Sequence, residues 1–438
     1  MNNSPENNNR SRQLFGIWTS ISLVIGNMIG SGIFLLPSAL AAFGGISIIG
    51  WVFTSIGSIL LSIVFMNLSR EFPKIGGPYV FVREAFGNFA GFIVAYGYWV
   101  STLCGNAAIA IASVSYLSIF FPVLSGTPFL SVITGLATLW VLTLINLLGM
   151  RVSGRIQLIT TILKLLPLIL IAFFGLFHFN PAHFSPFNIS SHNTFGAISA
   201  TAVLTLWAFL GLESATIPAD KIKNPKRTIP RATIIGTIVV AFVYVLSTVS
   251  IMGIISPADL VNSNAPFADA ASKLFSSVAG IIVAGAGVSA CIGALNGWIL
   301  LQSQISLAPA LDNLFPKAFR ILSKTGTPVW GSIISSSIVS LMMLLNYTEG
   351  FVVKFTFVIL LATLATLIPY LLSTLAQLKF ILRTGNVRSS VKLIIVSALA
   401  FLYSAWAVIG LGTYTIFWGI VLIATGIPIF IRMRMRKS

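Results

Sequence analysis

Charged residues, and acidic ones above all, are scarce in this chain. Only 8% of its 438 residues are charged and only nine are Asp or Glu, whereas a soluble globular protein carries about a quarter charged residues. So few charges cannot solvate the surface of a chain this long, which excludes a soluble globular protein. The hydrophobic content of 56% indicates instead a polytopic membrane protein built mostly from helices.

Cysteine and histidine are scarce as well. Cys104 and Cys291 both lie inside apolar runs and lack the spacing of metal ligands, so we expect neither a structural disulfide nor a cysteine metal site. The three histidines, His178, His183 and His192, share one loop with no carboxylate or cysteine beside them. A histidine metal site is conceivable in that loop, but scattered surface histidines are the favoured interpretation.

Apolar runs long enough to cross a bilayer are, by contrast, abundant. A spanning helix needs about 20 mainly apolar residues, and several runs exceed this, which indicates tilt, interruption or helical extension. The first six predicted spans are 14–37, 44–68, 87–119, 127–149, 157–178 and 194–218. The second six are 231–255, 279–309, 329–347, 352–378, 391–411 and 413–431. No cleavable signal peptide is expected in the polar, Asn-rich tail 1–13, because a long apolar run follows it.

The net charge of +17 gathers on one side of these spans. All but three of the 26 Lys and Arg residues fall in the tails and in alternate loops, the exceptions being Lys164, Lys273 and Lys354. This pattern is typical of membrane topology, so the positive charge does not indicate a nucleic-acid partner. By the positive-inside rule we expect both termini to be cytoplasmic.

Glycines interrupt two of the spans. The first span contains Gly26, Gly30 and Gly32 within seven residues, and the sixth contains Gly211. An unwound backbone inside the bilayer is costly unless it lines a cavity, so such breaks indicate a transport site. Small residues that only let helices pack closely are the alternative. The two breaks lie five spans apart, as an inverted repeat of five helices predicts.

Broken helices can bind both charges of one amino acid. The free N–H groups of Ser31 and Gly32 begin a half-helix, and a helix N-terminus attracts a carboxylate. Unwound carbonyl groups can accept hydrogen bonds from an ammonium group. The breaks therefore predict a site for an α-amino acid.

Two ionisable residues, Lys164 and Glu213, lie inside predicted spans, where charged groups are candidates for function. Glu213 could titrate during a transport cycle, hold a gate, or act only as a structural partner of a neighbouring hydroxyl. Lys164 is too central to snorkel easily, and its ammonium could donate to the exposed carbonyls of the first break; snorkelling and a purely structural pair are the alternatives.

Three aromatic residues, Trp207, Trp298 and Phe355, stand at or near positions that could face a site. Their rings could enclose an apolar stem or a cationic group. Packing alone is the alternative interpretation.

Two motifs resemble a known family. Asn27 to Pro37 is similar to the first-span signature of the amino acid–polyamine–organocation (APC) transporters. Trp207 to Ala215, followed by Lys223 to Pro230, resembles the sixth-span and loop signature of that family. The likeness runs from about residue 14 to the end, and it is strongest to the bacterial basic amino acid antiporters, in particular the arginine/agmatine exchanger.

The resemblance implies an all-α, LeuT-like membrane fold of twelve transmembrane helices, with helices 1 and 6 broken. The implied units are the polar tail 1–13, a first inverted repeat 14–178, a second 194–378, helices 11–12 over 391–431 and a basic tail 432–438. The implied function is antiport of arginine for agmatine in the cell inner membrane by alternating access, with acid resistance as the physiology. No cofactor is implied. The implied partners are the amino acid and amine substrates and the lipid bilayer; no residue decides whether the chain forms a homodimer.

The resemblance also implies roles for single residues. Ser31 and Gly32 would bind the substrate carboxylate, and Trp298 would stack against its guanidinium or amine-bearing stem. The residues implied to bind substrate are Asn27, Met28, Ser31, Gly32, Thr102, Asn106, Trp207, Leu210, Trp298 and Phe355. The residues implied to form gates or to handle protons are Tyr98, Lys164, Glu213 and Tyr370.

The chain also departs from the arginine exchanger. The departures are Thr102, Ile109, Asn296 and Ala362 in or near the implied pocket, and Lys164, which resembles the fifth-span lysine of other APC branches. A second positive charge near the site disfavours a dicationic amine unless Glu213 offsets it. A proton-coupled or exchanging carrier of neutral amino acids is therefore the second hypothesis.

Two other classes of protein are disfavoured. A membrane enzyme would need a cluster of acids, bases or metal ligands at membrane depth, where only Glu213 and Lys164 are available, and the histidines lie in one outer loop. The major facilitator superfamily also has twelve spans, but Ser69 to Pro73, after the second span, lacks its charged motif. We therefore predict a transporter and not an enzyme.

Overall fold

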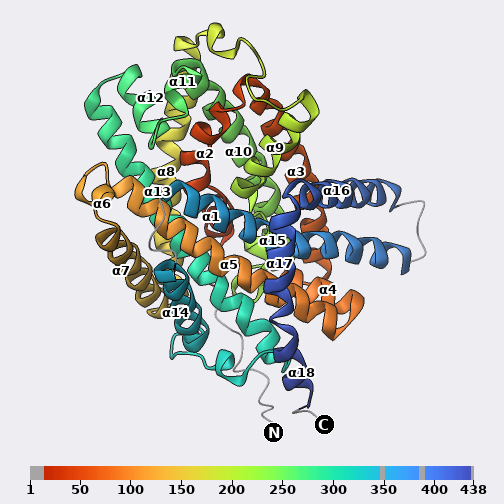
Figure 1. Ribbon diagram of the computed structural model, residues 1–438. Coiled ribbons are helices and arrows are strands. Elements are labelled where there is room, and N and C mark those ends of the chain that lie inside the picture. The colour runs from red at the N-terminus through yellow and green to blue at the C-terminus, as the bar shows by residue number, and fades with distance from the viewer. Residues whose placement is uncertain (1–13, 346–350, 384–389, 436–438) are drawn as a thin grey trace.

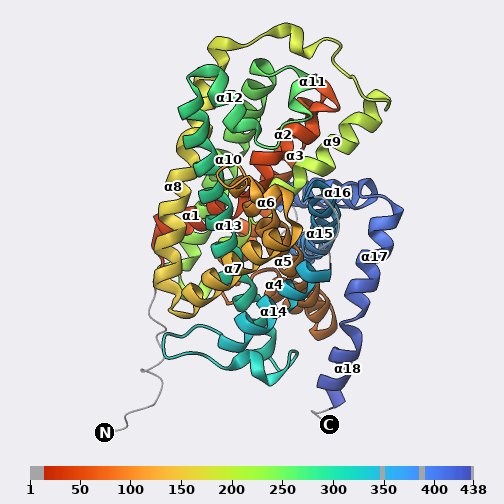
Figure 2. The same cartoon turned by 60° about the vertical axis from the view of Figure 1, so that its left-hand side comes forward.

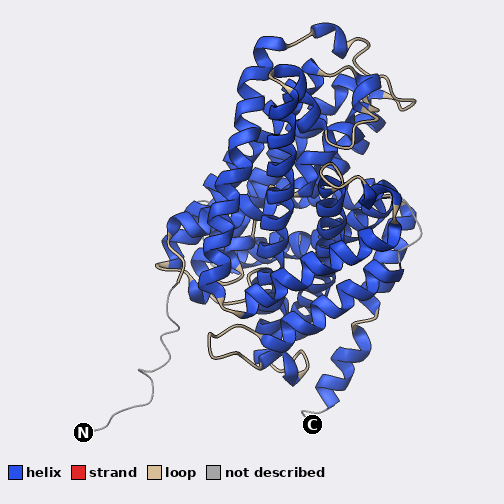
Figure 3. Cartoon of the chain, turned by 90° about the vertical axis from the view of Figure 1, so that its left-hand side faces the viewer, coloured by secondary structure: helices blue, strands red, loops and turns tan. Residues whose placement is uncertain are grey.

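The chain folds as a bundle of long helices (Figure 1). The computed structural model describes residues 14–345, 351–383 and 390–435, except for the side chains of residues 351–357. Figure 3 shows helices and loops only, and within the described ranges the strand-like contacts are two isolated bridges, Phe15 with Ile222 and Leu322 with Pro328.

The first eight helices are α1 (Ile17–Met28), α2 (Ser31–Ala41), α3 (Ser47–Glu71), α4 (Pro78–Phe86), α5 (Asn88–Leu117), α6 (Val123–Gly126), α7 (Pro128–Leu147) and α8 (Met150–Gly175). The next five are α9 (Thr194–Phe209), α10 (Pro225–Ile254), α11 (Pro257–Leu260), α12 (Pro266–Leu274) and α13 (Ser277–Leu311). The last five are α14 (Val329–Leu345), α15 (Phe351–Arg383), α16 (Val391–Gly410), α17 (Thr413–Ala424) and α18 (Ile427–Met435).

These helices supply the predicted membrane spans. Within the described residues, eleven stretches are long and apolar enough to cross a membrane. The apolar helix α14 is shorter and ends where the described range stops. Together they account for twelve spans, so the prediction of an all-helical, multi-pass membrane protein is confirmed.

Two predicted spans begin too late. Helix α8 begins at Met150 rather than 157, directly after Gly149, whose φ of +130° suits a residue without a side chain. Helix α10 begins at Pro225 rather than 231, because a proline at the first helical position has a φ angle already suited to the helix. In both cases basic residues that we had placed in a loop belong to the first turns of a helix.

The last predicted span, 413–431, is two helices rather than one. Helix α17 ends at Ala424 and α18 begins at Ile427. Gly426, between them, packs against the ring of Tyr96, since a Cβ atom there would lie 2.6 Å from Tyr96 Cδ1. The chain therefore bends where it meets α5, and α17 and α18 run down the outside of the bundle (Figure 2).

The two halves share an order of elements. In each, an interrupted helix is followed by a long helix, a nine-residue helix that begins with proline, and another long helix; the second half adds the four-residue α11 before its nine-residue helix. The two short helices, α4 and α12, lie at opposite ends of the bundle (Figure 1). We call these ends the α18 face, which also holds α4, and the α12 face, which also holds α11.

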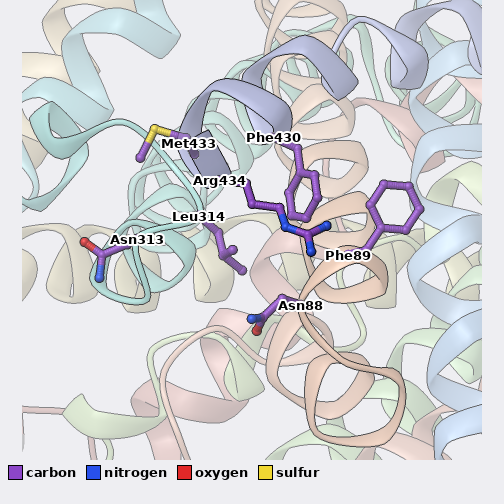
Figure 4. Close-up of a pocket in the computed structure, with 7 residues that line it drawn as sticks. All are labelled: Asn88, Phe89, Asn313, Leu314, Phe430, Met433 and Arg434. Carbon is purple, nitrogen blue, oxygen red and sulfur yellow. The ribbon is translucent and has the colours of Figure 1, made fainter. Parts of the chain in front are cut away.

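A cavity of about 530 Å³ opens near the α18 face (Figure 4). Its lining residues are Asn88, Phe89, Asn313, Leu314, Phe430, Met433 and Arg434. They come from the start of α5, the turn after α13 and α18, and none comes from an interrupted helix. This cavity is therefore distinct from the breaks that the sequence singled out.

Candidate functional site

The first break separates α1 from α2. Helix α1 ends at Met28, Ile29 is extended with ψ of 91°, and α2 begins at Ser31. Gly32, in the first turn of α2, packs against Trp207, because a Cβ atom there would lie 3.1 Å from Trp207 Cδ1. The new helix therefore begins with free N–H groups beside an aromatic wall.

A buried lysine from α8 satisfies the carbonyls of the first break. Lys164 Nζ donates to the carbonyl oxygens of Gly26 at 2.6 Å and Ile29 at 2.5 Å, and its side chain is fully buried. The contact expected from the sequence is therefore present, while a role for Lys164 in transport stays a prediction. Tyr244 of α10 adds a third bond, from its hydroxyl to the carbonyl of Met28 at 2.6 Å.

The second break follows α9. The helix ends at Phe209, Leu210 is extended, and Gly211 has a φ of +103°. That angle is disfavoured for residues with a side chain. A Cβ atom at Gly211 would also lie 3.1 Å from Asn27 Cβ and 3.1 Å from Trp298 Cζ2, so space as well as conformation requires glycine.

Glu213, at the end of the second break, lies between two phenols. Tyr98 of α5 donates to one carboxylate oxygen and Tyr370 of α15 to the other, and all three side chains are buried. The Tyr370 ring packs on Phe65 with centroids 5.3 Å apart. The structure thus brings together the three gate residues that the resemblance implied, from segments more than 100 positions apart.

The two breaks meet. Asn27 Nδ2 donates to Ser214 Oγ at 2.9 Å, which joins the end of α1 to the turn after the second break. Trp298 Nε1 of α13 donates to the Asn27 carbonyl at 3.1 Å. Trp207, Trp298 and the start of α2 therefore surround one small region, which we call the paired-break site.

Two polar atoms near this region lack partners among the described residues. Ser31 Oγ and Asn106 Oδ1 are both buried and form no hydrogen bond there. The other end of the Asn106 amide donates to Gln302 Oε1 at 2.6 Å. A buried polar atom without a partner costs free energy, so these atoms are positions where a bound polar ligand would restore a bond.

Three other residues were predicted to bind substrate: Thr102, Met28 and Phe355. The Thr102 hydroxyl donates to the carbonyl of Trp99 in its own helix at 2.6 Å. The Met28 carbonyl, expected to take an ammonium, already accepts bonds from Tyr244 and from Gly30 N–H. The side chain of Phe355 lies outside the described residues.

The histidines and cysteines show no shared site. His178 and His183 contact the backbone carbonyls of Phe174 and Met252, at 3.2 Å each. Both cysteines are free and buried. Among the described residues no group of three or more His, Cys, Asp or Glu side chains is placed to hold a metal ion.

Sequence reasoning missed four residues that contact the site: Gln157, Ser214, Tyr244 and Gln302. Gln157 carried a usable signal, because it lies seven positions before Lys164 and hence on the same face of α8. On that face, Gln157 Nε2 donates to the Ser22 carbonyl at 3.5 Å, and Lys164 Nζ donates to the Gly26 carbonyl at the first break. Gln302 carried the same kind of signal, because it lies four positions after Trp298 on α13, whereas Tyr244 carried none, because no predicted site residue lies on α10.

A second cavity, of about 220 Å³, lies toward the α12 face. Its walls come from α2, α5, α9, α15 and the segment between α11 and α12. Ser38 of α2 closes one edge by donating to the carbonyl of Ser263 at 2.7 Å. The cavity thus borders both interrupted helices, through α2 and α9.

Comparison with known proteins agrees with the motifs. The amino acid permease family matches residues 15–433. The putrescine transporter PotE of Haemophilus influenzae is 34% identical over 408 residues, which cover 92% of this chain and 93% of the relative. The cadaverine/lysine antiporter of Escherichia coli is 35% identical over 393 residues, 88% of this chain and 87% of the relative. The putrescine transporter PotE of Escherichia coli is 34% identical over 418 residues, 92% of each. The chain therefore belongs to the amino acid permease family, within the APC transporters that its motifs resemble.

Proposed function

We propose that this chain is an antiporter that exchanges a basic amino acid for its decarboxylated amine by alternating access. The observation that carries the proposal is the paired-break site itself, in which two unwound segments 187 positions apart are joined by the Asn27–Ser214 hydrogen bond. Unwound backbone at membrane depth is tolerated where it lines a binding site. The names of the relatives supply the chemical class of the substrate.

The site offers complementary groups for both ends of an amino acid. The substrate carboxylate would bind the free N–H groups of Ser31 and Gly32 and the unpartnered Ser31 hydroxyl. The α-ammonium would bind carbonyls of the breaks, those of Trp207 and Leu210 directly and that of Met28 in place of one of its two present donors. The stem would lie against Trp298, with Asn106 at its polar end; Thr102 and Phe355 complete the proposed pocket.

Tyr98, Glu213 and Tyr370 would act as a gate on one side of the substrate. Their hydrogen bonds tie α5 and α15 to the second break, so they must open before substrate can pass between these helices. Lys164 would hold the first break in shape. Measuring exchange across pH in Lys164→Ala and Glu213→Gln tests both roles; if neither variant moves the pH profile, neither residue is linked to protons.

Arginine with agmatine is the substrate pair that the motifs predict. The names of the relatives add two further candidates for the substrates, the pair lysine and cadaverine, and putrescine. Uptake of radiolabelled arginine or lysine into proteoliposomes preloaded with agmatine, cadaverine, putrescine, arginine, alanine or buffer decides between them. Stimulation by one amine supports the antiporter and names its pair, whereas uptake indifferent to every internal amine contradicts the proposal.

A carrier of neutral amino acids is the second candidate, and Lys164 is the observation that favours it. Its amino group is buried against the first break, and when protonated it places a positive charge beside the proposed pocket. A dicationic amine would then depend on Glu213 for compensation. Neutral amino acids that compete with labelled substrate, while agmatine, cadaverine and putrescine do not, would favour this candidate.

The topology completes the proposal. We place the chain in the cell inner membrane with both termini cytoplasmic, which puts the α18 face and its basic residues inside. We further propose that 14–178 and 194–378 are repeats of inverted topology, with 391–431 appended; the tails 1–13 and 436–438 lie outside the described residues. Exchange of this kind consumes intracellular protons when coupled to a decarboxylase, so acid resistance is the physiology we propose.

A further inference from the structure

Four buried amide side chains from four helices form one chain of hydrogen bonds that ends between the breaks. Asn146 Nδ2 of α7 donates to Asn296 Oδ1 of α13 at 3.1 Å, and Asn296 Nδ2 donates to Gln157 Oε1 of α8 at 3.5 Å. Gln157 Nε2 donates to Asn27 Oδ1 of α1 at 3.3 Å, and Asn27 Nδ2 donates to Ser214 Oγ at 2.9 Å. All five side chains are at most 3% exposed. We call this chain the amide relay.

The relay has a fixed direction. An amide has a donating NH₂ end and an accepting oxygen end, and a backbone carbonyl only accepts. The atom that faces a backbone carbonyl must therefore be the NH₂ group, which sets the orientation of each amide that has such a neighbour. These bonds join Asn146 to the Leu142 carbonyl at 3.0 Å, Asn296 to the Ser153 carbonyl at 3.0 Å, and Gln157 to the Ser22 carbonyl at 3.5 Å.

Two glycines leave room for the relay. A Cβ atom at Gly26 would lie 2.0 Å from Gln157 Nε2, and one at Gly297 would lie 1.9 Å from Asn27 Oδ1 and 2.8 Å from Gln157 Oε1. No atom fits at these distances, so any larger residue would push the amides out of their bonds. The glycine next to Trp298 is thus explained by the relay and not by the substrate.

The last amide touches both walls of the paired-break site. The side chain of Asn27 joins the second break through Ser214, and its backbone carbonyl accepts the bond from Trp298 Nε1. A change in the orientation of this amide would move the two breaks relative to each other and release the indole. The relay thereby connects helices α7, α8 and α13 to the geometry of the site.

We propose that Gln157, Asn296 and Asn146 are positioning residues that act through Asn27 to hold the two breaks at the spacing the substrate requires. The proposal rests on the proposed function for the identity of that substrate. Because the relay reaches the site through Asn27, the expected effect decreases with each step away from that residue. We expect substitutions in the relay to weaken substrate affinity and to leave the rate of the conformational cycle unchanged.

The test uses apolar substitutions of similar size in the full-length protein: Gln157→Met, Asn296→Leu and Asn146→Leu. Exchange is measured in proteoliposomes with arginine against internal agmatine and with lysine against internal cadaverine. We expect KM to rise about tenfold in Gln157→Met and about threefold in Asn146→Leu, as loss of one buried hydrogen bond predicts, with maximal rates within about twofold of the wild type.

Matched controls lie on the same helices. The Thr160 hydroxyl of α8 and the Thr138 hydroxyl of α7 each donate only to carbonyls of their own helix. Thr160→Val and Thr138→Val should therefore leave KM within about twofold of the wild type. If all three relay variants keep the wild-type KM, or if maximal rate falls while KM stays constant, the proposal is wrong.

A second measurement needs no substrate. Asn296 and Ser214 share no hydrogen bond, so Asn296→Leu and Ser214→Ala should lower Tm additively unless the relay couples them. We expect the double variant to lose clearly less than the sum of the two single losses, and an additive result overturns the relay. Because this cycle is independent of transport, a wild type that carries neither arginine nor lysine would contradict the proposed function alone.

Discussion

The two breaks are held by ionisable side chains of opposite type, a base at the first and an acid at the second. At the first, the Lys164 ammonium donates to two backbone carbonyls, and at the second, the Glu213 carboxylate accepts from two phenols. The groups that hold the first break come from α8 and α10, whereas those that hold the second come from α5 and α15. Lys164 therefore bonds the backbone of the break itself, while Glu213 bonds side chains of helices across the site.

We call the first break a fixed joint, because its bonds keep its shape, and the second a latch, because its bonds can open. A buried ammonium that satisfies two carbonyls leaves both unpaired if it withdraws, which costs about 1–3 kcal/mol for each group. The two phenols belong to α5 and α15, so the bonds to Glu213 open if either helix moves away from the second break during the proposed cycle. The comparison teaches that, under the proposed cycle, the first break keeps its shape while the second changes partners.

The largest effect is expected from removing the cation of the first break. Lys164→Met should lower the free energy of unfolding by about 2–5 kcal/mol, because it leaves the carbonyls of Gly26 and Ile29 without donors. Thermal unfolding of the purified protein measures this. Lys273→Met is the control, because Lys273 is half-exposed on α12 and lies 3.8 Å from Asp259. Equal stability of the two variants would contradict the fixed joint.

A smaller loss is expected from a methyl group in the second break. Gly211→Ala places a side chain at a φ of +103° and against Asn27 and Trp298, for a cost of about 2–4 kcal/mol. Gly412→Ala is a matched control, since its φ is +80° but no atom lies within 4 Å of the new Cβ. The difference between the two variants isolates the contact between the breaks, and no difference would mean that the breaks do not touch.

Neutralising the latch should affect transport more than stability. Glu213→Gln keeps one oxygen for a phenol but turns an NH₂ group toward the other, so we expect a stability loss of about 1–2 kcal/mol. Exchange, measured as initial uptake into loaded proteoliposomes, should fall more than tenfold. Tyr98→Phe and Tyr370→Phe each remove one bond and should give intermediate rates. Wild-type exchange in all three variants would exclude a gate at Glu213.

The smallest effect is expected at Tyr244, whose hydroxyl contacts carbonyls of both interrupted helices. The Tyr244 hydroxyl lies 2.6 Å from the Met28 carbonyl and 3.1 Å from the Ala208 carbonyl. Tyr244→Phe should cost about 1 kcal/mol, the net value of a hydrogen bond. Thr237→Val on the same helix is the control, because its hydroxyl donates only to its own helix. A larger loss in the free energy of unfolding for Tyr244→Phe than for Gly211→Ala would contradict this ranking.

Much of the fold could be predicted because hydrophobicity is local. Runs of apolar residues show the spans, and Gly30 and Gly211 mark both breaks. The errors at Met150, Pro225 and Gly426 came from boundaries, where a short signal such as a proline or a glycine competes with a long apolar run. The site was predicted in part, since the motifs indicated Tyr98, Glu213 and Tyr370 through a family resemblance and not through their contacts.

The sequence by itself determined the class of protein, the number of spans, the position of both breaks and the presence of two ionisable residues inside the membrane. These follow from the free energy of moving each residue out of water, which depends on that residue and its near neighbours. Only the tertiary structure decided that Lys164 lies on the first break, that Glu213 lies between two phenols, and that four amides run in one direction to Ser214. Such hydrogen bonds join residues up to 271 positions apart, and their choice depends on how distant helices pack.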